Sequence, residues 1–403
     1  GADAFAAVGS AFSLMTFLTS ILLGLAMGSG TVFSIRFGQK DQQGLKEGIL
    51  ASFALLGIVT ILLNVVIFAG IDWIIWALRT PESLKAMMRD YLMVIFAGMV
   101  GIFLYNFFAS LLRSLGNSLV PLVFLAISAG LNIVLDLWFV AGLGRGIAGA
   151  AEATVISQYV SGIGIWIYTR IKFPHLLKRE KDVRLRLRCV REIGSFSALT
   201  CLQQSIMNLG ILAVQGLVNS FGTTVMAAFA AAVKIDAFAY LPVQDFGNAF
   251  SIFVAQNYGA KDKDRIKKGI RAATGLSLSF GLLISICVFV FARPLMTLFI
   301  DAGEAAVIRE GVNYLHIEGA FYALIGGLFL LYGLYRALGK PGMSVVLTIV
   351  SLGTRVALAY ILAAIPGIGV IGIWWSVPIG WFLADALGVG YYWIKHKKLF
   401  SEM

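Results

Sequence analysis

The feature that most constrains this chain is the length of its uncharged runs. The stretch from Val8 to Ile35 holds no charged residue across 28 positions. A helix needs about 20 predominantly apolar residues to cross the hydrocarbon layer of a bilayer. Only 13% of the 403 residues are charged and 59% are hydrophobic, whereas an ordinary soluble domain has about 25% charged residues. The sequence therefore predicts a polytopic membrane protein.

Apolar segments of membrane length recur along the whole chain. Backbone groups in lipid must be satisfied within their own segment, which favours helices. The predicted fold class is an all-α polytopic membrane protein. We expect membrane helices over residues 8–35, 49–71, 91–112, 119–141, 149–169, 193–219, 224–257, 272–292, 311–335, 342–365 and 371–394.

One long polar stretch interrupts this pattern. The run from Arg170 to Arg191 carries nine Lys or Arg among 22 residues. Loops on its side of the membrane hold 24 basic residues, against 6 on the other side. The positive-inside rule then places this run and the C-terminus in the cytoplasm and Gly1 on the outer side. We expect a multi-pass protein of the cell inner (plasma) membrane. The net charge of +11 thus follows from topology, and we expect no nucleic-acid partner.

The residue types that bind metals are scattered. Cys189, Cys201 and Cys287 show no ligand-like spacing, and the three histidines are isolated. We therefore expect no disulfide framework, no metal site and no cofactor.

Two halves of the chain repeat each other. The words FGQKD at 37–41 and YGAKD at 258–262 match at an offset of 221, and RSLGNS at 113–118 matches RALGKP at 336–341 at 223. We expect an N-lobe over 1–170, a basic linker over 171–191 and a C-lobe over 192–403. The second half holds six predicted helices and the first only five. A counterpart of residues 193–220 is expected before residue 1, which would make twelve helices in two pseudo-symmetric six-helix lobes.

Several sequence motifs, and their order along the chain, resemble those of the multidrug and toxic compound extrusion (MATE) family, and most closely its DinF-like branch. These motifs are GADAFAAVG, the FGQKD and YGAKD turns, LLRSLGNSLVP, LNIVLDLWFV, GIAGAAEATVISQ and VKIDAFAYLPVQDFGNAFSIFVAQNYGA. The resemblance implies two lobes that open alternately to the two membrane faces and expel compounds in exchange for H⁺ or Na⁺. Related folds flip lipid-linked sugars, which implies a flippase as the alternative function.

Asp136 is the first candidate for the transport mechanism. It is surrounded by apolar residues in LNIVLDLWFV, and an acid at membrane depth costs about 2.5–3.5 kcal/mol on insertion scales. Asn132 lies one helical turn earlier on the same face, where its amide can donate to the carboxylate. By resemblance, Asn132, Asp136 and Thr154 match the polar cluster of the family's N-lobe cavity. Asn106 is a further candidate there. A structural polar contact between helices is the alternative interpretation.

The C-lobe candidates are of another kind. At an offset of 223, Asn132 corresponds to Arg355 and Asp136 to Ala359, so the C-lobe lacks the same acid. Its candidate cavity residues are Lys234, Asp236, Gln203, Gln204 and Arg355. By resemblance, the family's main N-lobe coupling acid lies on the first helix, which is missing here. Family members that bind Na⁺ in the C-lobe use an acid on the seventh helix, where this chain has glutamines, and this favours H⁺ over Na⁺.

The sequence thus favours a cation-coupled exporter of organic, cationic compounds, acting as a monomer among membrane lipids. A flippase would need a cavity ringed with cationic side chains, for which only Lys234 and Arg355 are candidates. An intramembrane enzyme would need clustered acids for Mg²⁺, and no DxxxD or DDxxD array is present. We therefore expect no enzymatic activity.

Overall fold

The computed structural model describes residues 2–77, 82–178 and 183–401, which contain helices and no strand. The first half comprises α1 (Ala2–Gly38), α2 (Gln42–Ala77), α3 (Glu82–Ala97), α4 (Met99–Ser114), α5 (Leu119–Asp136), the π-helix η1 (Leu137–Gly142), α6 (Gly146–Lys172) and α7 (Pro174–Leu177). The second comprises α8 (Leu187–Asn219), α9 (Thr223–Gly259), α10 (Lys263–Thr297), α11 (Ala305–Glu318), η2 (Gly319–Phe321), α12 (Tyr322–Ala337), α13 (Pro341–Ala363) and α14 (Val370–Ser401).

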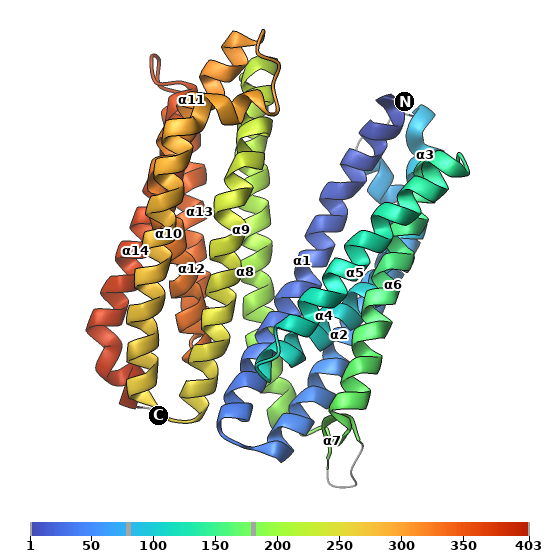
Figure 1. The fold of residues 1–403 in the computed structure, drawn as a ribbon, viewed down its shortest axis with the longest axis vertical. Helices are drawn as coiled ribbons and strands as arrows, with labels where there is room; N and C mark the ends of the chain where they lie inside the picture. Colours follow the sequence, from blue (N-terminus) through green and yellow to red (C-terminus); the bar gives the residue numbers. More distant parts are fainter. Residues whose placement is uncertain (1, 78–81, 179–182, 402–403) are drawn as a thin grey trace. The chain divides into compact units, whose positions relative to one another are not determined.

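The chain folds into two compact units, Gly1–Cys201 and Leu202–Met403 (Figure 1). The predicted all-α class is confirmed. Many helices are longer than the hydrocarbon layer is thick: α1 and α9 have 37 residues each, or about 55 Å at 1.5 Å per residue. Large apolar side chains lie on the outside, such as Trp73, Phe238 and Ile394, which are 68%, 74% and 78% exposed. Such a surface suits contact with lipid rather than with water.

Ten stretches within the described residues are long and apolar enough to cross a membrane. They account for each predicted segment except residues 149–169. That segment lies in α6, whose Glu152, Gln158 and serines lower its hydropathy. Helix α6 has 27 residues and packs against α4 and α5, so helix neighbours are available to these polar groups. That α6 spans the membrane remains a prediction.

An aromatic core holds the first unit together. Phe53 on α2 lies 5.1 Å from Phe103 and 5.2 Å from Phe107 on α4, between ring centroids. Phe33 on α1 meets Phe107 edge to face at 6.2 Å, an arrangement that suits the ring quadrupoles. Helices α4 and α6 pack backbone to backbone, because a Cβ atom at Gly162 would lie 2.5 Å from the carbonyl oxygen of Gly101.

The second unit is built around α9 and α12. A Cβ atom at Gly333 would lie 2.5 Å from the carbonyl oxygen of Gly247, so these glycines permit the close approach of the two helices. Trp374 on α14 is fully buried. Its ring stacks on Phe229 at 5.6 Å and meets Tyr314 edge to face at 4.9 Å, which ties α14 to α9 and α11.

The internal repeat is visible in the backbone. Lys40 and Lys261, at the offset of 221, both adopt positive φ angles, of 58° and 59°, which is uncommon for a residue other than glycine. At the offset of 223, Gly116 and Gly339 have φ of 87° and 75°. The repeated words therefore fold into equivalent turns, as the pseudo-symmetry predicts.

Helices extend into the predicted basic linker from both ends. Helix α6 continues to Lys172, the four-residue α7 follows, and α8 begins at Leu187. Residues 183–186 are not helical, and 179–182 lie outside the described part. Helix α8 then passes from the first unit into the second between Cys201 and Leu202. The lobe limits at 170 and 192 remain predictions, and Gly1, expected on the outer side, lies outside the described residues.

Candidate functional site

Two of the predicted N-lobe residues meet in the first unit. The side-chain amide of Asn132 on α5 donates to the Thr154 hydroxyl on α6 at 3.4 Å. Thr154 in turn donates to the carbonyl oxygen of Ala150 at 3.0 Å. Asn106 does not join them, since its amide donates to the Ile102 carbonyl one turn back on α4, at 2.9 Å. The hydroxyl of Ser128 also crosses from α5 to α6, bonding the Ser157 carbonyl at 2.9 Å.

Asp136 is the last residue of α5, and the π-helix η1 begins immediately after it. Its side chain is partly buried, and its Oδ1 atom is buried without a hydrogen-bond partner among the described residues. The expected hydrogen bond from Asn132 is not formed in this conformation. Single-turn π-helices often mark functional sites. An unpaired carboxyl oxygen at membrane depth can be satisfied by a proton or by a bound cation.

The second unit holds a more fully buried polar cluster, which we call the acid cluster: Asp236, Tyr314, Glu318, Tyr322 and Arg355. Asp236 on α9 accepts hydrogen bonds from the hydroxyls of Tyr314 on α11, at 2.5 Å, and Tyr322 on α12. All three side chains are buried. The sequence placed Asp236 among its candidates but gave no reason to bring these tyrosines to it.

Glu318 and Arg355 complete the acid cluster. Glu318, at the end of α11, is buried, and its Oε2 atom has no partner among the described residues. Arg355 on α13 lies within electrostatic reach of both Asp236 and Glu318, and its Nε atom is likewise buried without a partner. Two carboxyl groups thus share one guanidinium. With both acids ionised the three groups would carry a net negative charge, which a single proton or monovalent cation would neutralise.

The other C-lobe candidates have different surroundings. Lys234 is exposed, with its Nζ atom 5.6 Å from the ring centroid of Phe299. Two positions along a helix point to different faces, and accordingly Asp236 is buried while Lys234 is not. Gln203 is buried on α8, and Gln204 beside it is partly buried.

The site predicted from the sequence did not include Tyr314, Tyr322, Glu318 or Asp385. Tyr314 and Glu318 are four apart and share a helix face, which is a usable signal. Tyr322 lies beyond the 3₁₀ turn Gly319–Phe321, so helical spacing cannot connect it to the others. Asp385 on α14 has a buried, unpartnered Oδ1 atom, and its Oδ2 atom lies 3.2 Å from where a Cβ on Gly327 would be.

The two units have different polar residues at positions that correspond in the internal repeat. At the offset of 223, Tyr91 corresponds to Tyr314, but Asn132 corresponds to Arg355 and Asp136 to the fully buried Ala359. The candidate coupling acid of the first unit therefore lies on α5, and those of the acid cluster on α9 and α11. Among the described residues, no group of three or more His, Cys, Asp or Glu could hold a metal ion. The acid cluster suits a proton or one small monovalent cation.

Comparison with known proteins decides the family. The MatE family model matches residues 1–138 and 200–361. The chain belongs to the MATE family. It is similar to the probable multidrug resistance protein YoeA of Bacillus subtilis (strain 168), with 29% identity over 99% of this chain and 87% of that protein. YpnP of the same organism, another probable multidrug resistance protein, is 30% identical over 87% of this chain and 78% of its own length.

Solved structures agree on the MATE fold. The chain matches one described as the outward-facing conformation of a multidrug resistance MATE family transporter of the MOP superfamily. The TM-score is 0.93 at 22% identity, over 99% of this chain and 89% of that one. MATE proteins are transporters that handle small molecules, so the chain is a multi-pass membrane transporter and not an enzyme. Its curated relatives are named multidrug resistance or export proteins.

Proposed function

We propose that this MATE protein is a secondary-active exporter that exchanges organic, cationic compounds for a coupling cation by alternating access. The observation that carries the proposal is the acid cluster, where Asp236 and Glu318 are buried in the second unit and both interact electrostatically with Arg355. Two buried carboxyl groups beside one guanidinium need a further positive charge when both are ionised. A coupling cation supplies that positive charge when it binds in one conformational state, and it dissociates from the acid cluster in the other.

H⁺ is the favoured coupling ion, and Na⁺ is the second candidate. Tyr314 and Tyr322 both donate to Asp236, so hydroxyl hydrogens rather than oxygen lone pairs face this carboxylate. Such donors stabilise an ionised acid, whereas a Na⁺ ion needs several oxygen lone pairs directed at it. Glu318, with its unpartnered Oε2 atom, is then the acid that takes up and releases the proton. No cofactor is needed for this exchange.

Asp136 provides a second exchange site, in the first unit. Its unpartnered Oδ1 atom and the adjoining π-helix support the role that the sequence assigns to it. Asn132 and Thr154, bonded to each other across α5 and α6, line the same part of that unit. An organic cation with apolar groups would compete with the proton for the carboxylates, and this competition couples export to the cation gradient.

The proposed orientation follows the basic residues. The linker and C-terminus lie in the cytoplasm, Gly1 outside, and the protein works as a monomer in the plasma membrane. The basic linker residues then lie near anionic lipid head groups. Flipping of a lipid-linked oligosaccharide is the alternative function. It is less favoured because Lys234 lies over Phe299 while Arg355 faces the acids, so these two cations do not form a ring.

The test uses purified protein in liposomes, with a fluorescent organic cation inside. An imposed H⁺ gradient should drive its export, and a Na⁺ gradient of equal size should not. Glu318→Gln should abolish gradient-driven export but retain gradient-independent exchange of labelled for unlabelled substrate. Export driven by a Na⁺ gradient alone would show that the coupling ion is Na⁺ and not H⁺. If no organic cation moves but a lipid-linked sugar crosses the bilayer, the exporter proposal is wrong.

A further inference from the structure

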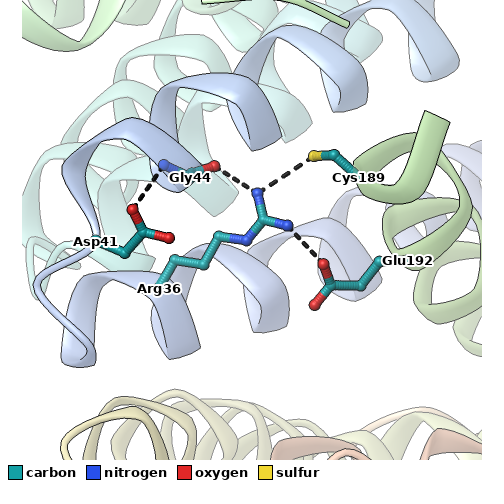
Figure 2. Close-up of polar contacts among 5 residues, drawn as sticks. All are labelled: Arg36, Asp41, Gly44, Cys189 and Glu192. Carbon is teal, nitrogen blue, oxygen red and sulfur yellow. Dashed lines mark hydrogen bonds and ion pairs between the residues drawn. The ribbon is translucent and has the colours of Figure 1, made fainter. Parts of the chain in front are cut away.

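The amino-terminal half of α8, Leu187–Cys201, is fastened to α1 and to the α1–α2 turn. Figure 2 shows the part of these contacts that centres on Arg36. The Arg36 guanidinium donates to Glu192 Oε2 at 2.5 Å, to Cys189 Sγ at 3.2 Å and to the carbonyl oxygen of Gly44. Asp41 accepts from the Gly44 amide at 2.8 Å and so holds the turn that presents this carbonyl. The Arg36 side chain is only 11% exposed.

A second ion pair of opposite polarity lies beside it. Arg186, immediately before α8, pairs through Nε with Glu47 Oε1 at 3.1 Å. The Glu47 side chain is 7% exposed, while Arg186 is 62% exposed. The first pair places the cation on α1 and the anion on α8, and the second places the anion on α2 and the cation before α8. Such an alternation fixes one register of α8, because a shift would bring like charges together.

We call the contact of Leu187–Cys201 with α1 and the α1–α2 turn the seam. Farther along the seam from the ion pairs, small and polar residues meet. The hydroxyls of Ser29 and Ser197 lie 3.0 Å apart, and Ser197 donates to the Leu25 carbonyl at 3.0 Å. A Cβ atom at Gly28 would lie 2.5 Å from the Cα of Ser197, and one at Gly24 would lie 2.6 Å from the Cα of Cys201. Gly24 and Gly28 are four residues apart and share one face of α1, with Ser29 at its edge.

This seam differs from the core of the first unit. The core is built from interlocking phenylalanines, whose separation would expose a large apolar area. The seam has fewer aromatic contacts: Ile193 and Cys189 of α8 are buried against the core of this unit, and the remaining contacts are glycines, a serine pair and two ion pairs. These polar contacts are specific in register, and each ion pair has one partner that is more than 40% exposed.

The covalent frame also permits opening. Nine residue steps separate Lys178 from Leu187, a length that can extend to about 30 Å. The second half of α8 belongs to the other unit, where Gly210 lies against Leu352 of α13, with a Cβ atom there 3.1 Å from the Leu352 side chain. One continuous helix is therefore held by both units, and any change between them must bend α8, open the seam or loosen the contacts of α8 with the second unit.

We propose that Leu187–Cys201 is a latch that detaches from α1 in every transport cycle, with the Arg36–Glu192 and Glu47–Arg186 pairs as its closing contacts. The latch rests on the proposed alternating-access function. Its opening moves α8 as one rod with the second unit, and its closing restores the register set by the ion pairs and by Ser29 and Ser197.

A disulfide lock tests the proposal. Ser29→Cys and Ser197→Cys are combined in a Cys189→Ser/Cys201→Ser/Cys287→Ser background, since the two hydroxyls already lie 3.0 Å apart. In liposomes, oxidation should stop transport of a fluorescent organic cation and reduction should restore it, while each single-cysteine variant is insensitive to both. Unchanged transport by fully cross-linked protein would overturn the latch, because α8 would then bend instead.

A second measurement does not depend on transport. In the same cysteine-free background with Ser197→Cys alone, maleimide labelling of Cys at this position reports how often the seam opens. Glu192→Arg should raise the labelling rate severalfold, because Arg36 then faces a like charge, and the reversed pair Arg36→Glu with Glu192→Arg should restore it. If the reversed pair labels as fast as the single variant, the ion pair does not close the latch. Failed transport with normal labelling behaviour would count against the exporter function rather than the latch.

Discussion

Removing the Tyr322 hydroxyl gives a quantitative test of the acid cluster. Tyr322 donates to Asp236 Oδ1, and Tyr314 donates to Oδ2. A hydrogen bond to a charged group contributes about 1.5–3 kcal/mol. Because the donor stabilises the ionised Asp236 carboxylate, Tyr322→Phe removes that amount from its charged form, so that Asp236 competes with Glu318 for the proton and the acid cluster as a whole binds it more tightly. At 1.36 kcal/mol per unit, the pH of half-maximal transport should rise by up to about 1–2 units.

The assay is substrate exchange across liposomes at equal pH on both sides, repeated over a pH series. Tyr335→Phe is the matched control, because its hydroxyl is also buried but donates to the backbone carbonyl of Gly388 at 2.5 Å. The control should keep the parental midpoint. A Tyr322→Phe midpoint equal to that of Tyr335→Phe, or one that moves to lower pH, would refute the assignment of Asp236 as an ionised, tyrosine-stabilised acid.

Three further predictions address other parts of the chain. Asp136→Asn should abolish efflux driven by a pH gradient while expression survives; retained efflux with unchanged pH dependence would contradict its role. Gly247→Val should destabilise the α9–α12 contact by at least about 1–3 kcal/mol through overpacking and lower the unfolding temperature in detergent. Gly275→Val, which faces open space, should not, and equal shifts would contradict the packing argument. Shortening the linker between Lys178 and Arg188 should slow transport without changing substrate preference, and altered preference in a competition assay would contradict this.

The helices, the repeat and the membrane class could be predicted because they depend on local composition. The turn words at 37–41 and 258–262 fixed one offset, and the structure places Lys40 and Lys261 in the same unusual conformation. Asp136 stood out for the same reason, as a charge within an apolar stretch. Its lack of a bond to Asn132 could not be predicted, because the Asn132 amide donates to Thr154 on α6 instead, a contact between two helices that the spacing within α5 does not determine.

The acid cluster required long-range contacts. Asp236 meets Tyr314 and Tyr322, which are 78 and 86 residues away, and Arg355 comes from yet another helix. No helical period connects these positions, and the turn at Gly319–Phe321 separates the two tyrosines. The sequence alone could mark the charged residues as costly in a membrane, but it could not say which of them lie close enough to neutralise one another.

The sequence by itself determined that this chain crosses the membrane many times, repeats itself about a basic linker and belongs with multidrug transporters. Those properties follow from hydropathy, charge and word order, which the chain carries whatever its final packing. Only the tertiary structure decided that α8 is bound to α1 by Arg36 and Ser197, and that the buried acids of the second unit converge on tyrosines and one arginine. Such pairings depend on which helix faces meet, and in lipid that choice is made by close packing and polar satisfaction rather than by hydropathy.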